Sequence, residues 1–399
     1  MIAIDRQMWK DVPYVVLSIL IGLALLLLHL PVQGGELSNG ARASYSIDAG
    51  YTTNGTDSAI GEADFFTTHS ASLEFASEEG GTALRGSLAL EDTRFLTQEI
   101  ENDQSLGLDL AIGRQVTRAL LLRGAFSALV ANTGDDWNLG GFYIATRTES
   151  VVGEARVEAV VTAEPLTLRL GVFGGFGRYG DASFPGLPLL PLKIQADTSR
   201  VGFDIAARYG FGGGLALRAG LAGEAVDVTV ADRQNLGRLP VSKLRGSFGL
   251  EAERGEMRLV ADAGGELAWA EGASVLRPYG RLHLALPVFE ALALQAELGS
   301  RVELVDALDY AGSFERSGSL ALAYNFDPAT RLVLSGQHTR RIGLLAPEVG
   351  SRETELALRF EQRVSESFSY RARIARLLHE DNVEHYQADE VSLGFTGSI

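Results

Sequence analysis

Cysteine is absent from this chain of 399 residues, which excludes a disulfide framework, a thiolate metal site and a cysteine nucleophile. Lysine is almost absent as well: only Lys10, Lys193 and Lys243 occur, so arginine supplies nearly all of the positive charge. Basic residues number 35 against 51 acidic ones, which gives a net charge of −16. That balance argues against a nucleic-acid partner, because phosphate backbones are bound through basic surfaces.

Long apolar runs are also scarce. Only Val15–Leu30 is long and uncharged enough to approach the length of a membrane-spanning helix, so a bundle of such helices is excluded. This run follows a long start that carries Arg6 and Lys10 beside Asp5 and Asp11, and it precedes small residues near Gly35, which is the layout of a secretory signal. We expect residues 1–35 to be a signal peptide, with an N-terminal anchor as the alternative, and residues 36–399 to form the remaining domain.

Proline is rare, with 11 residues against 46 glycines, a balance typical of many strands and turns. From about Arg42 onward, apolar and polar residues alternate, which predicts strands with two different faces. In Met257–Trp269, for example, Leu259 and Leu267 fall on one face while Asp262 and Glu266 fall on the other. A soluble β-sandwich would show the same alternation, so the connections must decide the fold.

Eighteen segments carry the strand pattern, and short links alternate with longer ones such as 131–150, 178–198 and 379–389. The segments are 42–51, 65–75, 82–91, 105–112, 117–130, 151–162, 166–177, 199–210, 214–225, 241–252, 256–270, 278–287, 291–303, 315–325, 331–341, 353–364, 367–378 and 390–399. An even strand number with short turns at one rim and long loops at the other predicts an all-β, transmembrane, antiparallel up-and-down β-barrel of about 18 strands.

In these features the chain resembles bacterial outer-membrane β-barrel proteins from Tyr45 to Ile399. The resemblance is architectural and rests on no family-specific motif. It implies localisation in the bacterial cell outer membrane and contact with outer-membrane lipid. Within that class the layout is similar to sugar-specific porins and polysaccharide exporters.

If the apolar face of each strand meets lipid, the opposite face lines a wet interior, because unpaired charges in a dry core cost several kcal/mol each. An 18-stranded barrel is wide enough for an aqueous channel. The predicted pore-lining residues are Arg85, Arg123, Arg156, Glu158, Arg169, Asp204, Arg208, Arg218, Arg245, Glu251, Arg258, Asp262, Glu266, Arg281, Glu297, Arg301, Glu355, Arg359, Arg371 and Arg373.

This lining predicts an outer-membrane channel for a hydrophilic solute or saccharide, since arginine and carboxylate side chains can hydrogen-bond sugar hydroxyls, carboxylates or phosphates. Only Phe173 and Tyr279 are expected among inward aromatics, which favours polysaccharide export, with periplasmic export partners, or a general porin over a sugar-specific porin. The equally simple reading is that the charges only pair across strands. The alternative function is a surface receptor or structural barrel with acidic ligand-binding loops, and an anchored soluble β protein is a third option.

An apolar, proline-stiffened stretch lies in a segment expected to face water. Its residues Pro185, Leu187, Pro188, Leu190 and Pro191 are candidates for a plug folded into the pore. Packing on the barrel's own rim is the simpler interpretation, because loops usually bury such residues locally.

Signals for chemistry are weak. His379, Glu380 and His385 lie close in sequence, but their spacing fits no zinc motif, and we expect no metal site. The glycine-rich stretches 171–177 and 210–214 open no helix and so do not match dinucleotide-binding loops. We expect no catalytic residues, no cofactor and no enzyme activity.

Overall fold

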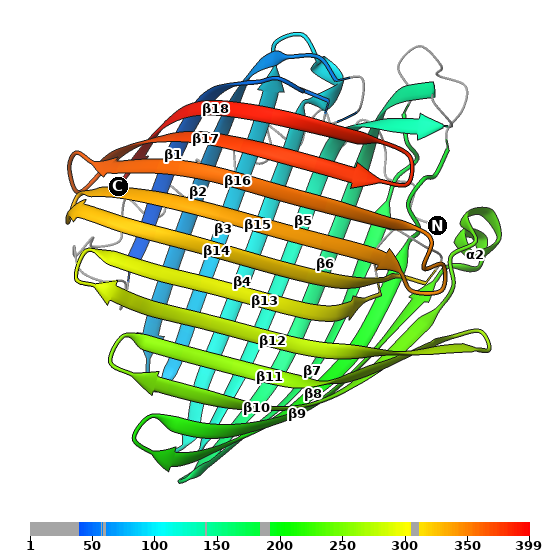
Figure 1. The fold of residues 1–399 in the computed structure, drawn as a ribbon. Coiled ribbons are helices and arrows are strands. Elements are labelled where there is room, and N and C mark those ends of the chain that lie inside the picture. The colour runs from blue at the N-terminus through cyan, green and yellow to red at the C-terminus, as the bar shows by residue number, and fades with distance from the viewer. Residues whose placement is uncertain (1–39, 57, 59–60, 140–141, 184–191, 305–310) are drawn as a thin grey trace.

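The computed structural model describes residues 40–56, 58, 61–139, 142–183, 192–304 and 311–399, with side chains left out over 135–145. They form one closed barrel of 18 antiparallel strands, in which each strand pairs with its neighbour in sequence and β18 pairs with β1 (Figure 1). The predicted fold class and strand number are confirmed. The predicted signal peptide lies outside the described residues. Within them, no helix is long and apolar enough to span a bilayer.

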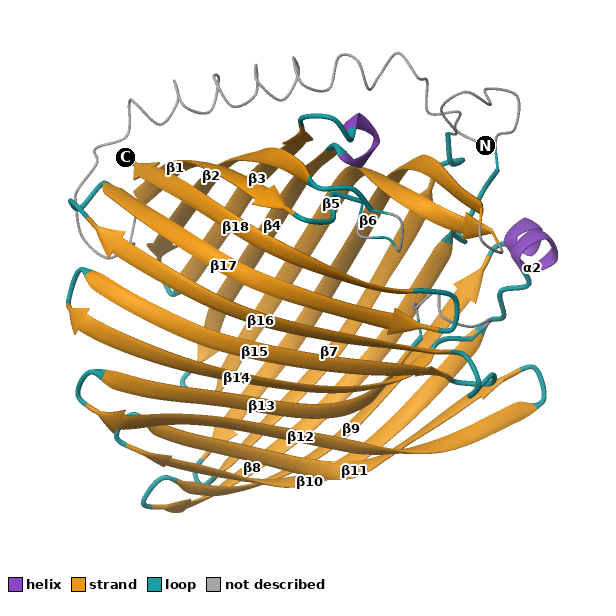
Figure 2. Cartoon of the chain, turned by 45° about the horizontal axis from the view of Figure 1, so that its top comes forward, coloured by secondary structure: helices purple, strands orange, loops and turns teal. Residues whose placement is uncertain are grey.

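Most strands are longer than the sequence pattern suggested, although β11 and β13 are each one residue shorter, and two short helices accompany the strands (Figure 2). The elements are β1 (Gly40–Thr52), β2 (Asp64–Glu79), β3 (Thr82–Phe95), the 3-10 helix η1 (Glu99–Glu101), β4 (Asp103–Thr117), β5 (Leu120–Leu139), β6 (Phe142–Ala163), β7 (Leu166–Tyr179), β8 (Thr198–Gly212), β9 (Leu215–Val228), α2 (Val230–Leu236), β10 (Val241–Arg254), β11 (Met257–Ala270), β12 (Ala273–Phe289), β13 (Leu292–Glu303), β14 (Ser313–Asp327), β15 (Thr330–Gly343), β16 (Gly350–Arg363), β17 (Phe368–Asp381) and β18 (His385–Ser398).

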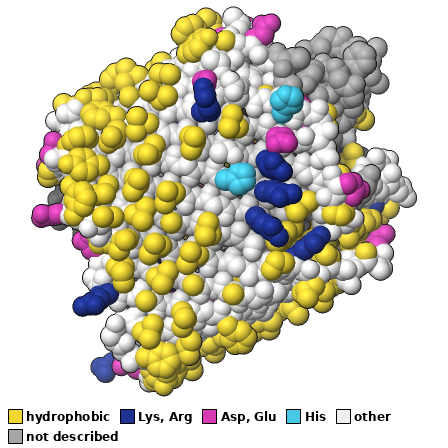
Figure 3. Space-filling view, viewed as in Figure 1, with side chains coloured by type: hydrophobic (Ala, Val, Ile, Leu, Met, Phe, Trp, Pro, Cys, Tyr) yellow, Lys and Arg dark blue, Asp and Glu magenta, His cyan; other side chains and the backbone are white. Residues whose placement is uncertain are grey.

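The outer face of the barrel is apolar because alternation continues in register from strand to strand. Leu267 and Trp269 on β11 are more than two-fifths exposed on that face, whereas Ala268 between them and Glu266 before them are buried on the inside. Apolar side chains are spread over much of the outer face seen in Figure 3. An apolar exterior around a closed sheet leaves no backbone polar group exposed to lipid, which is the condition for spanning a membrane with strands.

One rim of the barrel consists of tight turns. Seven of its eight connections have two residues, and the eighth is 364–367. Glycine meets the backbone demand at several of these turns: Gly213 and Gly214 both have positive φ, +61° and +82°, where other residues are strained. Short turns mark the periplasmic rim of outer-membrane barrels, so the opposite rim is extracellular.

Two of the predicted long loops are wrong. Residues 131–150 belong mainly to the paired ends of β5 and β6, and residues 379–389 belong mainly to β17 and β18. Neither segment keeps the apolar outward face of a membrane strand, because strands that rise above the membrane meet water on that face. The alternation that marks a membrane strand is therefore lost there although the backbone pairing continues.

Candidate functional site

The interior of the barrel is the candidate site. The strand registers place all twenty predicted pore-lining residues on the inner face, as the pairs Arg123–Glu158, Asp262–Arg281 and Arg359–Arg373 illustrate. Passage of a solute over these residues stays a prediction. Their neighbours show which of them are held by one another and which are open to the lumen.

The largest ionic network crosses the inner faces of β5 to β8. Glu158 lies 3.4 Å from Arg123, 3.8 Å from Arg156 and 3.6 Å from Arg169. Asp204 pairs with Arg156 and lies 3.6 Å from Arg169. Each carboxylate is nearly buried under its arginines, so this network mainly ties neighbouring strands together.

A second network continues on β8 to β11. Glu251 is 3.3 Å from both Arg208 and Arg218, and Arg218 is also 3.3 Å from Asp262. The barrel closure carries a related bond, because Arg371 on β17 pairs with Asp48 on β1. Much of the predicted lining is therefore engaged in pairing rather than free for a solute.

A groove in the inner wall of β2 to β6 is different. It encloses about 940 Å³ and is lined by Glu74, Arg85, Ser87, Asp109 and Glu154, among others. Within the described part of the chain, Glu74, Arg85 and Asp109 have neither an ion pair nor a side-chain hydrogen bond. These side chains offer unused donors and acceptors to whatever fills the lumen.

Inward aromatics are more numerous than the sequence analysis expected. Besides Phe173 and Tyr279, the registers place Phe66, Phe95 and Tyr386 on the inner face. The rings of Phe66 and Phe95 lie 5.8 Å apart between centroids. The expectation that separated this barrel from sugar-specific porins was wrong in this respect: Phe95 and Tyr386 lie beyond the predicted strand limits, and Phe66 was overlooked within them.

The extracellular mouth is narrowed by strands that leave the wall. The ladder between β12 and β13 stops at Gly280–Ser300, although β12 continues to Ala273 beside β11. The freed peptide groups of Val302 are bound from the inner wall: Glu266 on β11 accepts from the Val302 N–H, and Lys243 on β10 donates to its carbonyl at 2.6 Å.

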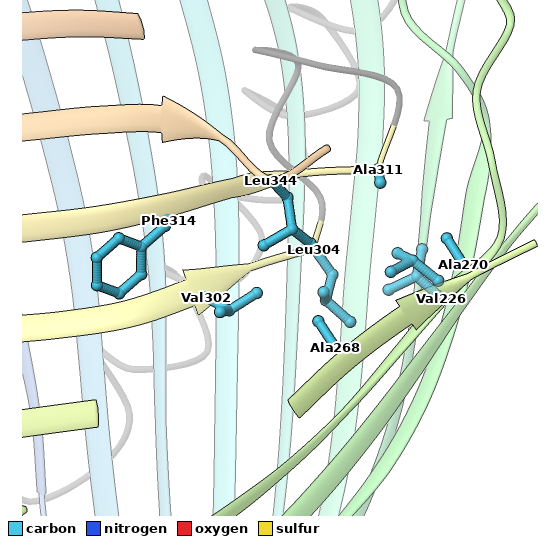
Figure 4. Close-up of a cluster of buried hydrophobic side chains, with 9 residues drawn as sticks. Val226, Ala268, Ala270, Val302, Leu304, Ala311, Phe314 and Leu344 are labelled. Carbon is cyan, nitrogen blue, oxygen red and sulfur yellow. The ribbon is translucent and has the colours of Figure 1, made fainter. Parts of the chain in front are cut away.

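The infolded ends form a second layer over the inner wall. Val302, Phe314 and Leu344 form one buried cluster with the inward side chains Val226 and Ala268, and all five are at most 3% exposed (Figure 4). The face that would meet lipid lower on the same strands is buried here against the inside of the barrel. This apolar contact keeps the ends of β13 to β15 inside the mouth.

The predicted plug residues Pro185 to Pro191 lie outside the described residues. The infolded ends of β13 to β15 were not predicted. The available signal was the pair Val302 and Leu304, which extends the apolar face beyond the expected lipid band.

A second contact at the extracellular rim joins a loop to α2. This helix begins at the N-cap Thr229, whose hydroxyl accepts from the Asp232 N–H, and ends at Gly237 with φ +66°. Burial opposes the charge on Asp232, but bonds from Lys193 Nζ at 2.9 Å, the Asp197 N–H and Thr229 together lower its pKa. Thr229 and Gly237 were a readable helix signal that the sequence analysis missed.

The three residues weighed as a metal cluster do not converge. Register places Glu380 and His385 on the outer face and His379 on the inner face, where His379 stacks on Tyr386 at 4.8 Å between ring centroids. The described residues contain no group of three side chains arranged to hold a metal ion.

Comparison with known proteins gives fold similarity only. No protein-family model and no curated protein matches the chain. A ferric enterobactin receptor (PfeA) mutant from Pseudomonas aeruginosa superposes with a TM-score of 0.50 at 8% identity, over 90% of this chain and 80% of the receptor. The outer-membrane protein OpdK from the same organism gives 0.43 at 11% identity, over 90% and 98%. The copper transporter OprC gives 0.49 at 10% identity, over 93% and 82%.

The closed 18-stranded sheet, its apolar exterior and the similarity to the receptor barrel define the class of protein. The chain has the fold of a bacterial outer-membrane β-barrel protein, and the predicted localisation in that membrane is confirmed.

Proposed function

We propose that the barrel is an outer-membrane channel that passes a hydrophilic, hydroxyl-rich solute. The observation that carries the proposal is the 940 Å³ groove, in which Glu74, Arg85 and Asp109 have no partner among the described side chains. Charged groups without a protein partner need water or solute around them. They lie on the inner wall of a barrel wide enough to hold water.

The mixture of groups indicates the kind of solute. A saccharide hydroxyl both donates and accepts, and the groove supplies donors from Arg85 and acceptors from Glu74 and Asp109. A wall of one sign would instead select one ion. A saccharide is therefore the preferred solute, and export of a polysaccharide with periplasmic partners is the more specific form of the proposal.

Planar-bilayer recording tests the channel directly. We expect the wild type to conduct, and a neutral oligosaccharide such as maltohexaose to produce transient blocks. The variant R85Q/D109N keeps the net charge and should shorten these blocks about threefold or more, because two hydrogen-bonding side chains lose their charge. The matched control R376Q/D389N removes an ion pair on the outer face and should leave the blocks unchanged.

The alternative is a surface receptor with a closed lumen. The apolar layer at the mouth favours it, because that layer occupies part of the lumen. Absence of current both from the wild type and from a variant with the Val302 contacts removed would overturn the channel proposal in favour of the receptor.

A further inference from the structure

The outer face of the barrel carries a row of arginines. Arg316 on β14 is the direct cross-strand partner of Arg340 on β15, and Arg340 is the direct partner of Arg352 on β16. All three share the outward face with Leu320, Leu334 and Leu356, and all three are exposed. Dark-blue side chains accordingly gather on the outer surface toward the extracellular rim (Figure 3).

This row works against folding. Directly opposite residues on one face have Cβ atoms about 5 Å apart, and like charges there are destabilising. Arg352 is 3.4 Å from Glu380, but both side chains are more than half exposed. Arg316 lies over the ring of Phe314, and within the described residues neither Arg316 nor Arg340 has a carboxylate within ion-pair distance. A chain with a net charge of −16 thus concentrates three cations on the surface that faces lipid.

The depth of the row is defined by the apolar band below it. On β14, Arg316 is followed on the same face by Gly318, Leu320, Leu322 and Tyr324, and Tyr324 belongs to the aromatic pairs near the periplasmic rim. Eight residues correspond to about 26 Å along a strand, or about 20 Å along the membrane normal at the usual tilt. The hydrocarbon band of such barrels is about 25 Å tall, and arginine side chains extend toward the interface. The guanidinium groups therefore lie at the outer-leaflet headgroups.

We propose that Arg316, Arg340 and Arg352 form a binding site for the phosphate groups of a phosphorylated glycolipid in the outer leaflet. Guanidinium groups bind phosphate oxygens through paired, charge-assisted hydrogen bonds, and this geometry suits arginine better than lysine. A bound phosphate neutralises the repulsion along the row, while the acyl chains of the same lipid cover the leucines beneath it. A membrane lipid fits both halves of this surface, whereas free phosphate fits only the first. The site is independent of what passes through the lumen.

Native mass spectrometry of the purified barrel tests this site, with diphosphorylated lipid A as the probe and phosphatidylethanolamine as the comparison lipid. We expect the wild type to retain lipid A in preference to phosphatidylethanolamine. The variant R316Q/R340Q/R352Q should bind lipid A about tenfold or more weakly, because three charge-assisted contacts are lost. The matched control R114Q/R118Q/R254Q removes three arginines at the periplasmic rim and should bind as the wild type does.

Heat-modified mobility in gel electrophoresis reports whether each variant is folded, so loss of lipid by a folded triple variant supports the site. Equal lipid A retention by the wild type and the triple variant overturns it. Displacement of lipid A by inorganic phosphate at millimolar concentration also overturns the assignment to a lipid, because it shows a general anion site. If the triple variant fails to fold, the single variant R340Q gives the same comparison.

Discussion

Lys243 on β10 and Val302 on β13 are joined by a hydrogen bond although their strands are not neighbours: Nζ donates to the carbonyl oxygen at 2.6 Å. Lys243 also lies 3.2 Å from Glu224, which orients the ammonium group. This bond and the one from the Val302 N–H to Glu266 take the place of the backbone hydrogen bonds that β13 no longer makes with β12 beyond Ser300.

Removing both contacts should open the mouth. In K243A/E266A the buried peptide groups of Val302 lose their partners, at a cost of about 1–3 kcal/mol for each unsatisfied group. We expect the ends of β13 to β15 to leave the inner wall and single-channel conductance in planar bilayers to rise. The variant E154A/R200A removes one acid and one base from the lumen without touching Val302 and is the matched control. Equal conductance changes in the two variants would contradict the role of this contact.

The α2 contact should depend on pH. The pKa of Asp232 is lowered below its ordinary value of 3.8, so its ionised form stabilises the folded state. That contribution is fully present above about pH 3.8 and is lost as the pH falls through the lowered value. We expect limited proteolysis near residues 193–197 to accelerate in acid in the wild type but not in D232N, whose rate should already be high at neutral pH.

The same contact has an alkaline limit. Burial disfavours the charge on Lys193, but its bonds to Asp197 and Asp232 outweigh this and raise its pKa above 10.5. Its contribution is therefore present below about pH 10.5 and is lost as the pH rises through the raised value. K193M should remove the alkaline loss of protection in hydrogen exchange, and persistence of that loss would point to another group.

Two adjacent glycines in the β8–β9 turn should respond differently to alanine. Both have positive φ, but a Cβ on Gly214 would stand 1.7 Å from the carbonyl oxygen of Glu253, whereas one on Gly213 would meet nothing within 4 Å. We expect G213A to cost about 1 kcal/mol of folding free energy from backbone strain alone and G214A to cost more. Urea unfolding in lipid vesicles measures both, and equal costs would show that the turn moves away from Glu253.

The cost of an arginine introduced on the outer face should depend on how deep in the membrane it lies. Leu358 and Thr354 share the outward face of β16, but Leu358 is four residues closer to the periplasmic rim. An arginine near the centre of the band costs about 2–4 kcal/mol, and one near the interface about 0–1 kcal/mol. L358R should therefore lower the folding free energy in vesicles substantially more than T354R. The reverse order would contradict the membrane position assigned here.

The sequence predicted what depends on local alternation. The number of strands, the inward side of residues such as Glu158 and Arg218, and the outer-membrane class all follow from a period of two combined with turn spacing. The lengths of the strands were harder to predict, because β5, β6, β17 and β18 continue beyond the membrane, where their outward face is no longer apolar.

The features that the sequence did not predict depend on contacts between segments that are distant in sequence. The infolding of Val302 requires Lys243 and Glu266, 59 and 36 residues away, and no local pattern encodes that meeting. The arginine row could have been predicted, because Arg316, Arg340 and Arg352 are each an even number of residues from the outward leucines of their strands. The expectation that charged residues line the lumen left these outward arginines unpredicted.

The pairing of β1 with β18 brings Ser44 opposite Ser398, so the two extremes of the described chain form one seam. Bonds between Arg371 and Asp48 cross that seam over 323 positions of sequence. A nascent chain lacking its last strand would expose two unpaired strand edges to the hydrocarbon of the bilayer. Backbone N–H and C=O groups without hydrogen-bond partners are not tolerated there. The chain must therefore either insert into the membrane after the final hairpin has formed, or keep its unpaired strand edges away from lipid until that hairpin pairs.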